Sequence, residues 1–469
     1  MDGIVATLRL EEDSLGDVDV PIAALWGAQT ERARNNFVIS GVTMGEFPTL
    51  VAALAMVKQA AARANVEAGV LDRDKADLIE AACVKLVNGE HLDAFPIDMI
   101  QGGAGTSANM NANEVIANLA NTIAGRARGD YAFMHPNDHV NRSQSTNDVY
   151  PSAVKLSLVA ASRPLEAGLA GLADRFETCA GTFADIFKLG RTQLQDAVPM
   201  TLGQEFRAFA ATLSKDVEAL RAVIPQLYEL NLGGTAIGTG LNAPAGYAQA
   251  AIAELRTITG LPLHTADDLI EASWDMGAFL SLSAMLRRIA TKLSKIANDL
   301  RLLSSGPRGG LGEIHLPEMQ PGSSIMPGKV NPVIPEVVNQ VCFQVIGNDV
   351  AVTLAAEAGQ LQLNAMEPLI AYNLHWSLQL LVRAVAVFDE RCVSGIVPDP
   401  ARCRAHLDAS VVSVTALVPI IGYAASAKLA KDALKSGATI KESVLAEQIL
   451  TVSELSLLDP AVLVFPHGR

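Results

Sequence analysis

The sequence predicts a mainly α-helical protein built around a bundle of long helices. Two apolar stripes, over residues 202–227 and 279–303, repeat at intervals of three and four residues. A period near 3.5 residues is typical of a helix face that packs against other helices. The aromatic share of 5% is low for a sandwich or barrel with an aromatic core.

The stripes are long enough for extended helices. The stripe over 279–303 consists of Phe279, Leu282, Leu286, Ile289, Leu293, Ile296, Leu300 and Leu303. The stripe over 202–227 consists of Leu202, Phe206, Phe209, Leu213, Val217, Leu220, Ile224 and Leu227, and Pro225 is expected to kink it. A third helix is indicated by Leu165, Leu169, Leu172 and Phe176. Helices of about 25 to 30 residues are typical of an elongated bundle, and we expect these stripes to form its core without taking part in chemistry.

Composition excludes several classes of protein. Of the 469 residues, 50% are hydrophobic and 18% are charged, which excludes a disordered chain and permits a large core. The net charge of −14 argues against non-specific binding of nucleic acid. An anionic substrate would therefore need cations placed locally in its site.

The cysteines and the termini point to the cytoplasm. Five scattered cysteines form no Cys-x-x-Cys pair, so we expect neither a disulfide framework nor a zinc site made from them. The first residues are acidic and lack the apolar segment of a signal peptide. The uncharged stretch 410–427 contains Pro419 and Gly422 and is interpreted as a buried helix and turn rather than a membrane span.

Two nucleotide motifs and one metal motif fail on spacing or context. Gly322–Val330 resembles a phosphate-binding loop, but it has one residue too many between its glycines and Val330 where magnesium needs a hydroxyl. Gly103–Ala108 fits the G-x-G-x-x-A form without a preceding strand, so a dinucleotide site is a weak alternative. His135 and His139 are four residues apart, but Pro136 and Asn137 interrupt a helix and no third ligand is near. We expect hydrogen-bonding histidines and no metal.

Polar side chains concentrate in segments between the predicted helices. These segments are 101–113, 135–151, 190–204, 231–244 and 304–335. They carry Ser, Thr, Asn and Gln together with Arg191 and Lys329, which is the set of donors needed to hold carboxylates in a water-poor pocket. Most conspicuous is Gln320–Pro332, where glycines and prolines frame Ser323, Lys329 and Asn331 in a loop able to close over a substrate.

Several of these segments together resemble the aspartase/fumarase superfamily. The run Gly322–Pro332 looks like the signature of that family. The other matching blocks occur in the family's order and are Gln101–Asn111, His135–Asp148, Gly190–Asp196 and Asn231–Asn242. The resemblance extends from about Leu25 into the C-terminal region, and several long blocks in fixed order make it specific.

The blocks favour the aspartate-deaminating branch over the hydratases. Gly102–Ser107, Arg191–Met200, Pro332–Gln340 and Asn364–Pro368 resemble the ammonia-lyases, whereas Trp26–Thr30 is more like class II fumarase. Fumarases usually have Ser at the position of Ala104 and His at that of Gln193, and are thought to activate water with that His and a Glu matching Glu336. Glutamine takes up no proton at neutral pH, so this water-handling pair would be missing. Class II fumarase stays the alternative.

The resemblance implies a reaction and a set of residues. The reaction would be reversible conversion of L-aspartate to fumarate and ammonia by anti elimination through an aci-carboxylate, without an organic cofactor or a metal. The implied catalytic residues are Ser323 as the base, Lys329 and Asn331. The implied substrate-binding residues are Thr106, Ser145, Thr146, Asn147, Thr192, Gln193 and Ser324.

The resemblance also implies an architecture and partners. Three domains are expected: an N-terminal mixed domain (1–143), a central helical bundle (144–398) and a small C-terminal helical domain (399–469). Family members form homotetramers with a twenty-helix core and active sites shared between subunits. The partners would be a small dicarboxylate and further copies of this chain, with neither nucleic acid nor membrane. Relatives that serve as structural lens proteins are the non-enzymatic alternative, against which the intact Ser323, Lys329 and Asn331 argue.

Overall fold

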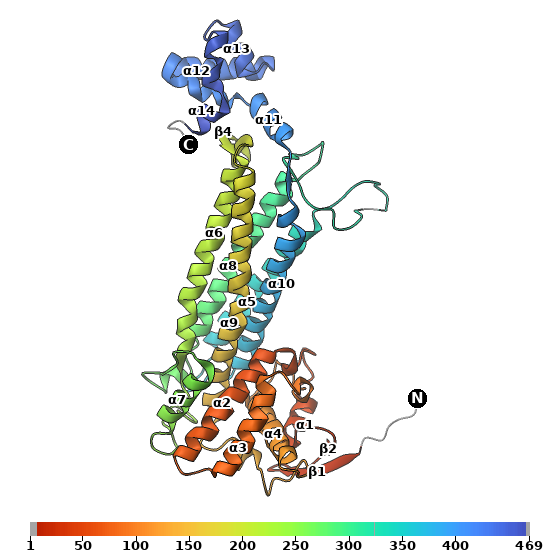
Figure 1. Cartoon of the computed structure of the whole chain (residues 1–469), viewed down its shortest axis with the longest axis vertical. Helices are drawn as coiled ribbons and strands as arrows, with labels where there is room; N and C mark the ends of the chain where they lie inside the picture. Colours follow the sequence, from red (N-terminus) through yellow and green to blue (C-terminus); the bar gives the residue numbers. More distant parts are fainter. Residues whose placement is uncertain (1–6, 323, 466–469) are drawn as a thin grey trace. The chain divides into compact units, whose positions relative to one another are not determined.

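The computed structural model describes residues 7–322 and 324–465, and these residues are mainly α-helical (Figure 1), which confirms the predicted class. The chain forms two compact units, each assembled from three separate stretches of sequence. Unit 1 comprises Met1–Glu166, Ala219–Arg288 and Phe343–Leu381. Unit 2 comprises Ala167–Glu218, Ile289–Cys342 and Val382–Arg469. The division into domains at residues 143 and 398 stays a prediction.

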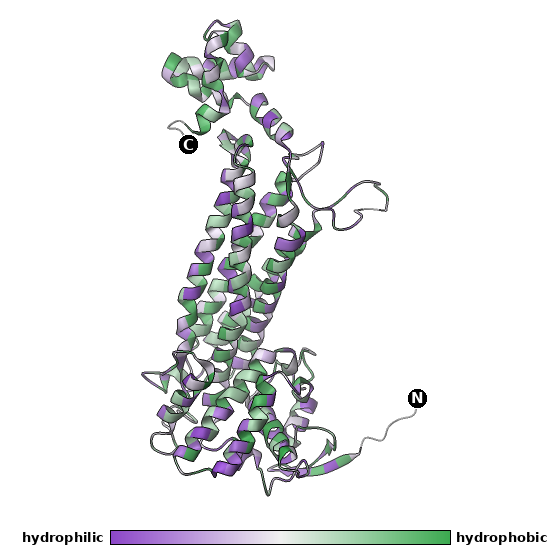
Figure 2. Ribbon diagram, in the orientation of Figure 1, coloured by the Kyte–Doolittle hydropathy of each residue, from purple (hydrophilic) through white to green (hydrophobic). Residues whose placement is uncertain are grey.

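The long helices have residues in both units. They are α5 (Thr146–Thr182), α6 (Leu202–Val223), α8 (Gly277–Leu303), α9 (Val333–Glu357) and α10 (Glu367–Arg391). Every position of the apolar stripe on α8 is at most 5% exposed, so the predicted core role is confirmed. Helix α6 ends at Val223 and a 3₁₀ turn, Ile224–Tyr228, follows, so Pro225 marks a break as expected. Figure 2 shows apolar and polar residues alternating along these helices.

Unit 1 contains a group of shorter helices and a β-hairpin. Its further elements are β1 (Leu8–Asp13), β2 (Gly16–Pro21), α1 (Ala28–Asn36), α2 (Pro48–Glu67), α3 (Arg73–Val87), α4 (Thr106–Ile123), β5 (Glu229–Leu230), α7 (Tyr247–Thr259) and β6 (His264–Thr265). Strands β1 and β2 pair antiparallel, and β5 and β6 pair parallel. Helix α2 packs against α3 and α7, and α3 packs against α4 (Figure 1).

Unit 2 contains the remaining short elements. They are β3 (Phe187–Thr192), β4 (Gln195–Thr201), β7 (Ile314–His315), β8 (Val397–Pro398), α11 (Pro400–Ala409), α12 (Val418–Ser436), α13 (Ile440–Ala446) and α14 (Pro460–Val464). Strands β3 and β4 form an antiparallel hairpin in which Thr192 faces Gln195, and α11 packs against β3. The short C-terminal helices, expected from the change of pattern after residue 400, surround a small apolar cluster that includes Leu417, Leu429 and Val444.

Three polar segments expected to be loops are partly regular structure. Helix α4 begins at Thr106, α5 begins at Thr146, and residues 190–201 lie mostly in the β3–β4 hairpin. For the two helices the reason is that Ser, Thr, Asn and Asp stabilise the first turn of a helix as readily as a loop. The polar composition therefore indicated where helices α4 and α5 begin. The prediction of a loop was wrong for the residues of these segments that lie in α4, α5 and the β3–β4 hairpin.

The uncharged stretch 410–427 is helical but largely exposed. It forms a 3₁₀ turn (Val411–Leu417) and the start of α12, which is interrupted at Gly422. The expectation of burial was wrong, because side chains such as Ile420 and Tyr423 are 50% and 79% exposed on the small C-terminal cluster. Two helical segments are long and apolar enough to cross a membrane, Val411–Ser436 and Val333–Glu357. Core helices of soluble proteins meet the same criteria, so this is weak evidence for a membrane span.

Candidate active site

A polar cavity of about 500 Å³ in unit 1 is lined by one predicted site residue, Ser145. It is lined by the segment that leads into α5, which includes Asn141 and Ser145, and by the turn that contains Thr235 and Ala236. Neutral donors and acceptors dominate this wall. A cavity of this size and polarity accommodates a small dicarboxylate.

Hydrogen bonds fix Thr146 and Asn147 at the start of α5. Asn109 of α4 donates from Nδ2 to Thr146 Oγ1 at 3.0 Å and to Asn141 Oδ1 at 3.2 Å. Asn147 donates from Nδ2 to the carbonyl of Ala236 at 2.7 Å. Ser145 Oγ accepts from the backbone N–H of Asn147 at 3.3 Å, which leaves its own proton available. Ser145 thus lines the cavity, whereas Thr146 and Asn147, which follow it in the first turn of α5, are not among the lining residues.

Buried charges beneath this wall were missed by sequence reasoning. Asp148 is fully buried, and burial raises the pKa of its carboxyl to about 6 although backbone hydrogen bonds favour the charged form. Lys58 of α2 is also fully buried, and burial lowers the pKa of its ammonium to about 7. Its Nζ donates to Asn141 Oδ1 at 2.8 Å and to Gln144 Oε1 at 2.9 Å. The signal available beforehand was the Asn-Asp pair that ends the block His135–Asp148.

Thr106 lies at the first turn of α4 with its side chain exposed. Its Oγ1 donates to the carbonyl of Gly103 at 2.7 Å. The preceding Gly105 has φ of 87°, and a Cβ there would lie 2.4 Å from the ring of Tyr150. Glycine is therefore required at the entry to this helix. Two backbone N–H groups of its first turn are already bonded, because Thr106 donates to the carbonyl of Gly103 and Ala108 donates to Gln101 Oε1.

A second cavity, of about 680 Å³, lies in unit 2 and contains Lys329 and Asn331. Glu336, Arg301 and His315 line it as well. Ser323 lies outside the described residues, and Ser324 is exposed. The two ends of this loop come together at Gly322, where a Cβ would lie 1.8 Å from the carbonyl oxygen of Lys329. Only glycine allows that approach.

Arg301 is a further cation in this cavity that sequence reasoning did not select. Its Nη1 donates to Asn339 Oδ1 at 3.1 Å. The amide of Asn339 is held in this orientation because its Nδ2 donates to Ser294 Oγ at 2.9 Å. Arg301 therefore has a neutral hydrogen-bond partner, and the cavity carries two cations, Arg301 and Lys329, together with the carboxylates of Glu318 and Glu336.

Thr192 and Gln193 lie at the tip of the β3–β4 hairpin and are exposed. Gln193 and Leu194 form its two-residue turn with φ of 55° and 60°. Both values belong to the left-handed region that favours Gly or Asn in such a turn. Arg191, one of the cations considered for carboxylate binding, instead donates to Glu313 Oε1 at 2.7 Å.

His135 and His139 make hydrogen bonds, as predicted. His135 Nδ1 accepts from the backbone N–H groups of Asn137 and Asp138 at 3.1 Å, and His139 Nδ1 accepts from the N–H of His135 at 2.8 Å. Burial and the neighbouring Lys75 lower the pKa of His139. The intervening residues form a short π-helix, Pro136–Val140, rather than a break. Among residues 7–322 and 324–465, no three His, Cys, Asp or Glu side chains are grouped so that they could hold a metal ion.

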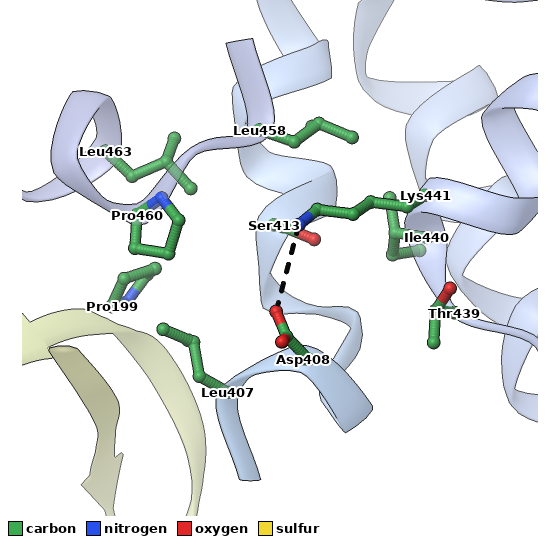
Figure 3. A pocket seen from close by; sticks show the side chains of 10 residues that line it. All are labelled: Pro199, Leu407, Asp408, Ser413, Thr439, Ile440, Lys441, Leu458, Pro460 and Leu463. Atoms are coloured by element: carbon green, nitrogen blue, oxygen red, sulfur yellow. Dashed lines mark ion pairs between the residues drawn. The ribbon is translucent and has the colours of Figure 1, made fainter. Parts of the chain in front are cut away.

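A small cavity in the C-terminal part of unit 2 is unsuited to a substrate. Figure 3 shows it between Pro199, Leu407 and the last helices, with Lys441 reaching toward Asp408 at 3.9 Å. Its volume is about 20 Å³, which is room for about one water molecule.

Comparison with known proteins assigns the chain to a family. The family model described as "Lyase" matches residues 16–347, and the model described as "Fumarase C C-terminus" matches residues 414–464. The chain therefore belongs to the aspartase/fumarase superfamily of lyases, as its motifs predicted.

Within this superfamily, the chain is similar to aspartate ammonia-lyases over nearly its whole length. The enzyme from Pseudomonas aeruginosa is 56% identical over 99% of this chain and 98% of its own. The enzyme from Escherichia coli is 49% identical over 96% of this chain and 94% of its own. Among solved structures, a fumarate lyase:delta crystallin from Brucella melitensis bound to cobalt has a TM-score of 0.95 at 57% identity, covering 97% of this chain and 99% of that one. A class II fumarase from Schistosoma mansoni has a TM-score of 0.93 at 36% identity, and the match covers 98% of this chain and 100% of that one.

Proposed function

We propose that this chain is a carbon–nitrogen lyase that converts L-aspartate reversibly to fumarate and ammonia. The observation that carries the proposal is its full-length similarity to aspartate ammonia-lyases at 49 to 56% identity. The class II fumarase alternative is not favoured, because the class II fumarase from Schistosoma mansoni is only 36% identical and Gln193 cannot act as a proton acceptor at neutral pH. Both described cavities carry the neutral donors that a dicarboxylate requires.

The difficult step is removal of a proton from the carbon next to a carboxylate. In the proposed mechanism the Ser323 alkoxide takes that proton, and the electron pair moves onto the carboxylate to give an aci-carboxylate. Lys329 and Asn331 stabilise the added negative charge. The pair then returns to form the carbon–carbon double bond, the carbon–nitrogen bond breaks, and ammonia leaves. Thr106, Ser145, Thr146, Asn147, Thr192, Gln193 and Ser324 orient the substrate.

Substitution of Ser323 tests the proposed chemistry. We expect Ser323→Ala to lower kcat for aspartate by a factor of about 10³ or more with a smaller change in KM, since the base acts only in the transition state. The readout is the ultraviolet absorbance of fumarate, first with aspartate and then with malate as sole substrate. Ser304→Ala, which changes another hydroxyl of the Lys329 cavity, is the matched control. Near-normal turnover by Ser323→Ala removes Ser323 from the role of base, and turnover of malate alone overturns aspartate deamination.

We further propose a homotetramer with active sites shared between subunits. Helix α9 supports it, because Phe343, Val350 and Leu354 are 60%, 57% and 64% exposed in the single chain. If sites are shared, mixing a Thr106→Ala variant with a Lys329→Ala variant restores part of the activity that each has lost. Intact tetramers that fail to complement contradict shared sites.

The proposed location is the cytoplasm. All five cysteines are free thiols, which agrees with a reducing compartment. The net charge of −14 leaves nucleic acid out of the proposed partners, which are the dicarboxylate substrate and further copies of this chain.

A further inference from the structure

Unit 2 contains a fully buried carboxylate that none of the proposed chemical steps uses. The side chain of Glu313 is 0% exposed and lies just before β7. Lys188 Nζ lies 2.8 Å from its Oε2, and Arg191 Nη1 lies 2.7 Å from its Oε1. His406 Nδ1 of α11 lies 3.0 Å from the same Oε1. Glu205 of α6 pairs with the other side of Lys188.

The backbone of Glu313 is anchored as firmly as its side chain. Its N–H donates to the carbonyl of Leu303 at the end of α8 at 2.9 Å. Its carbonyl accepts from the N–H of Asp399, which precedes α11, at 2.9 Å. Glu313 therefore connects the end of α8, strand β3 and helix α11 at one buried point.

The two elements that meet at this point carry predicted substrate contacts. On one side, Arg191 directly precedes Thr192 and Gln193 at the tip of the hairpin. On the other side, His315 to Glu318 follow Glu313 and line the same cavity as Lys329 and Asn331. A shift of Glu313 would thus be transmitted to both groups.

Stability alone is a poor explanation for such a cluster. Removing several charges from water costs as much as their attraction returns, and apolar side chains of similar volume would stabilise the fold equally well. Burial opposes ionisation of Glu313, but its partners Lys188, His406 and Arg191 outweigh burial and lower the pKa of its carboxyl below the ordinary value. Lys188 and Arg191 of β3 and His406 of α11 meet one carboxylate, and these directional contacts specify one arrangement, which apolar contacts do not.

We propose that Glu313 is a positioning residue for the lyase reaction, which holds the β3–β4 hairpin and the cavity wall His315–Glu318 in one fixed arrangement. It acts through Arg191 on the hairpin and through its own backbone on the wall. This proposal rests on the function proposed above, since it assigns a role in binding the same dicarboxylate.

The test is Glu313→Gln, which keeps the volume and removes the charge. We expect KM for aspartate to rise at least tenfold with a smaller change in kcat, because the hairpin contacts bind substrate. In a double-mutant cycle with Thr192→Ala, the combined effect on KM is smaller than the product of the single effects, since Glu313 acts through the hairpin. The matched control is Asp216→Asn, which removes another buried carboxylate of unit 2, paired with Lys292, and is expected to leave KM unchanged.

A second measurement separates positioning from folding. Hydrogen exchange of the intact protein should become faster in residues 190–196 and 314–318 of Glu313→Gln, with unchanged rates in α6. If that variant fails to fold, Arg191→Gln removes the link between Glu313 and the hairpin, together with a contact of Arg191 to His406, and should reproduce the rise in KM. Multiplicative effects in the cycle, or an unchanged KM in a folded Glu313→Gln or Arg191→Gln variant, overturn the proposal. A wild-type protein without aspartate activity would instead refute the proposed function. The hydrogen-exchange result would still show whether Glu313 holds the hairpin and the cavity wall in place.

Discussion

Asp148 Oδ2 accepts a hydrogen bond from the backbone N–H of Thr235 at 2.9 Å, across 87 residues of sequence. The same oxygen accepts from the N–H of Gly233 at 3.0 Å, and Oδ1 accepts from the N–H of Ser145 at 3.0 Å. One buried carboxylate thereby holds together the two segments that line the unit 1 cavity. The shape of that cavity therefore depends on the carboxylate of Asp148, which accepts all three hydrogen bonds and has no N–H group of its own to turn toward these donors.

Asp148→Asn should therefore weaken both the fold and substrate binding. The amide keeps one acceptor oxygen and turns N–H groups toward backbone donors, which leaves buried polar groups unpaired at a cost of about 1–3 kcal/mol. We expect a loss of that size in the free energy of unfolding and a rise of about tenfold in KM for aspartate. Urea denaturation and steady-state kinetics measure the two effects.

The matched control for Asp148 is Asp98, which also caps several backbone donors in unit 1. Its carboxylate accepts from the N–H groups of Ser40, Gly41 and Ile100 at 2.6 to 2.9 Å, and it does not line the cavity. Asp98→Asn should lower stability to a similar extent while KM stays unchanged. Equal effects of both variants on KM would show that Asp148 has no special relation to the site.

Regular periodicity made the helices predictable. The stripe on α8 repeats without interruption from Phe279 to Leu303, and each of its side chains is buried as the period requires. Polar composition singled out Ser145, which lines the unit 1 cavity, but it assigned Thr146 and Asn147 to a loop although they begin helix α5. A helix N-terminus and a loop use the same side chains, so composition alone cannot separate them.

Contacts between distant segments could not be predicted from the sequence. Nothing local to Glu313 indicates that Lys188, Arg191 and His406 will surround it, because those partners come from strand β3 and helix α11, far from Glu313 along the chain. The turn at Gln193 and Leu194 was equally hidden, since neither residue is typical of a turn with positive φ. Such departures from local preference are expected at functional sites.

Stability should depend on pH through His375. This side chain of α10 is fully buried, its Nε2 lies 2.8 Å from Ser157 Oγ, and burial lowers its pKa from 6.5 to about 4. Between these values the unfolded chain binds a proton that the folded protein does not. The free energy of unfolding therefore falls as pH decreases from 6.5 to 4, by about 1.4 kcal/mol per pH unit for this group.

His375→Gln should remove this contribution while retaining a hydrogen-bonding partner for Ser157. Denaturation at several pH values measures the slope for the variant and the wild type. His264→Gln is the control, because His264 is exposed and its substitution should leave the wild-type slope in place. Identical slopes for His375→Gln and wild type would contradict the assignment.

A charge on the exposed face of α9 should disrupt the proposed tetramer. Phe343 is 60% exposed in the single chain, and burying an aromatic side chain contributes about 1.5–3 kcal/mol per copy. Phe343→Glu removes this favourable free energy and would place a charge in the proposed subunit interface. We therefore expect dissociation to smaller species and loss of activity. Sedimentation or light scattering measures the mass. Val84→Glu, on an exposed part of α3, is the control and should leave the mass unchanged.

Gln193→His should change the chemistry open to the site without disturbing the hairpin. The φ of 55° at this position is strained for most residues, but His adopts the left-handed region several-fold more often than average. We therefore expect unfolding to be unchanged within about 0.5 kcal/mol. The imidazole would supply a proton acceptor that glutamine lacks. By resemblance to the fumarases, its partner in the water-handling pair would be Glu336, which lines the unit 2 cavity. The expected result is lower turnover of aspartate together with detectable conversion of malate to fumarate, and Gln193→Asn, which suits the same φ but binds no proton, should show the first effect without the second. If both variants convert malate equally, or neither does while both remain folded, then the identity of residue 193 does not decide between deamination and hydration.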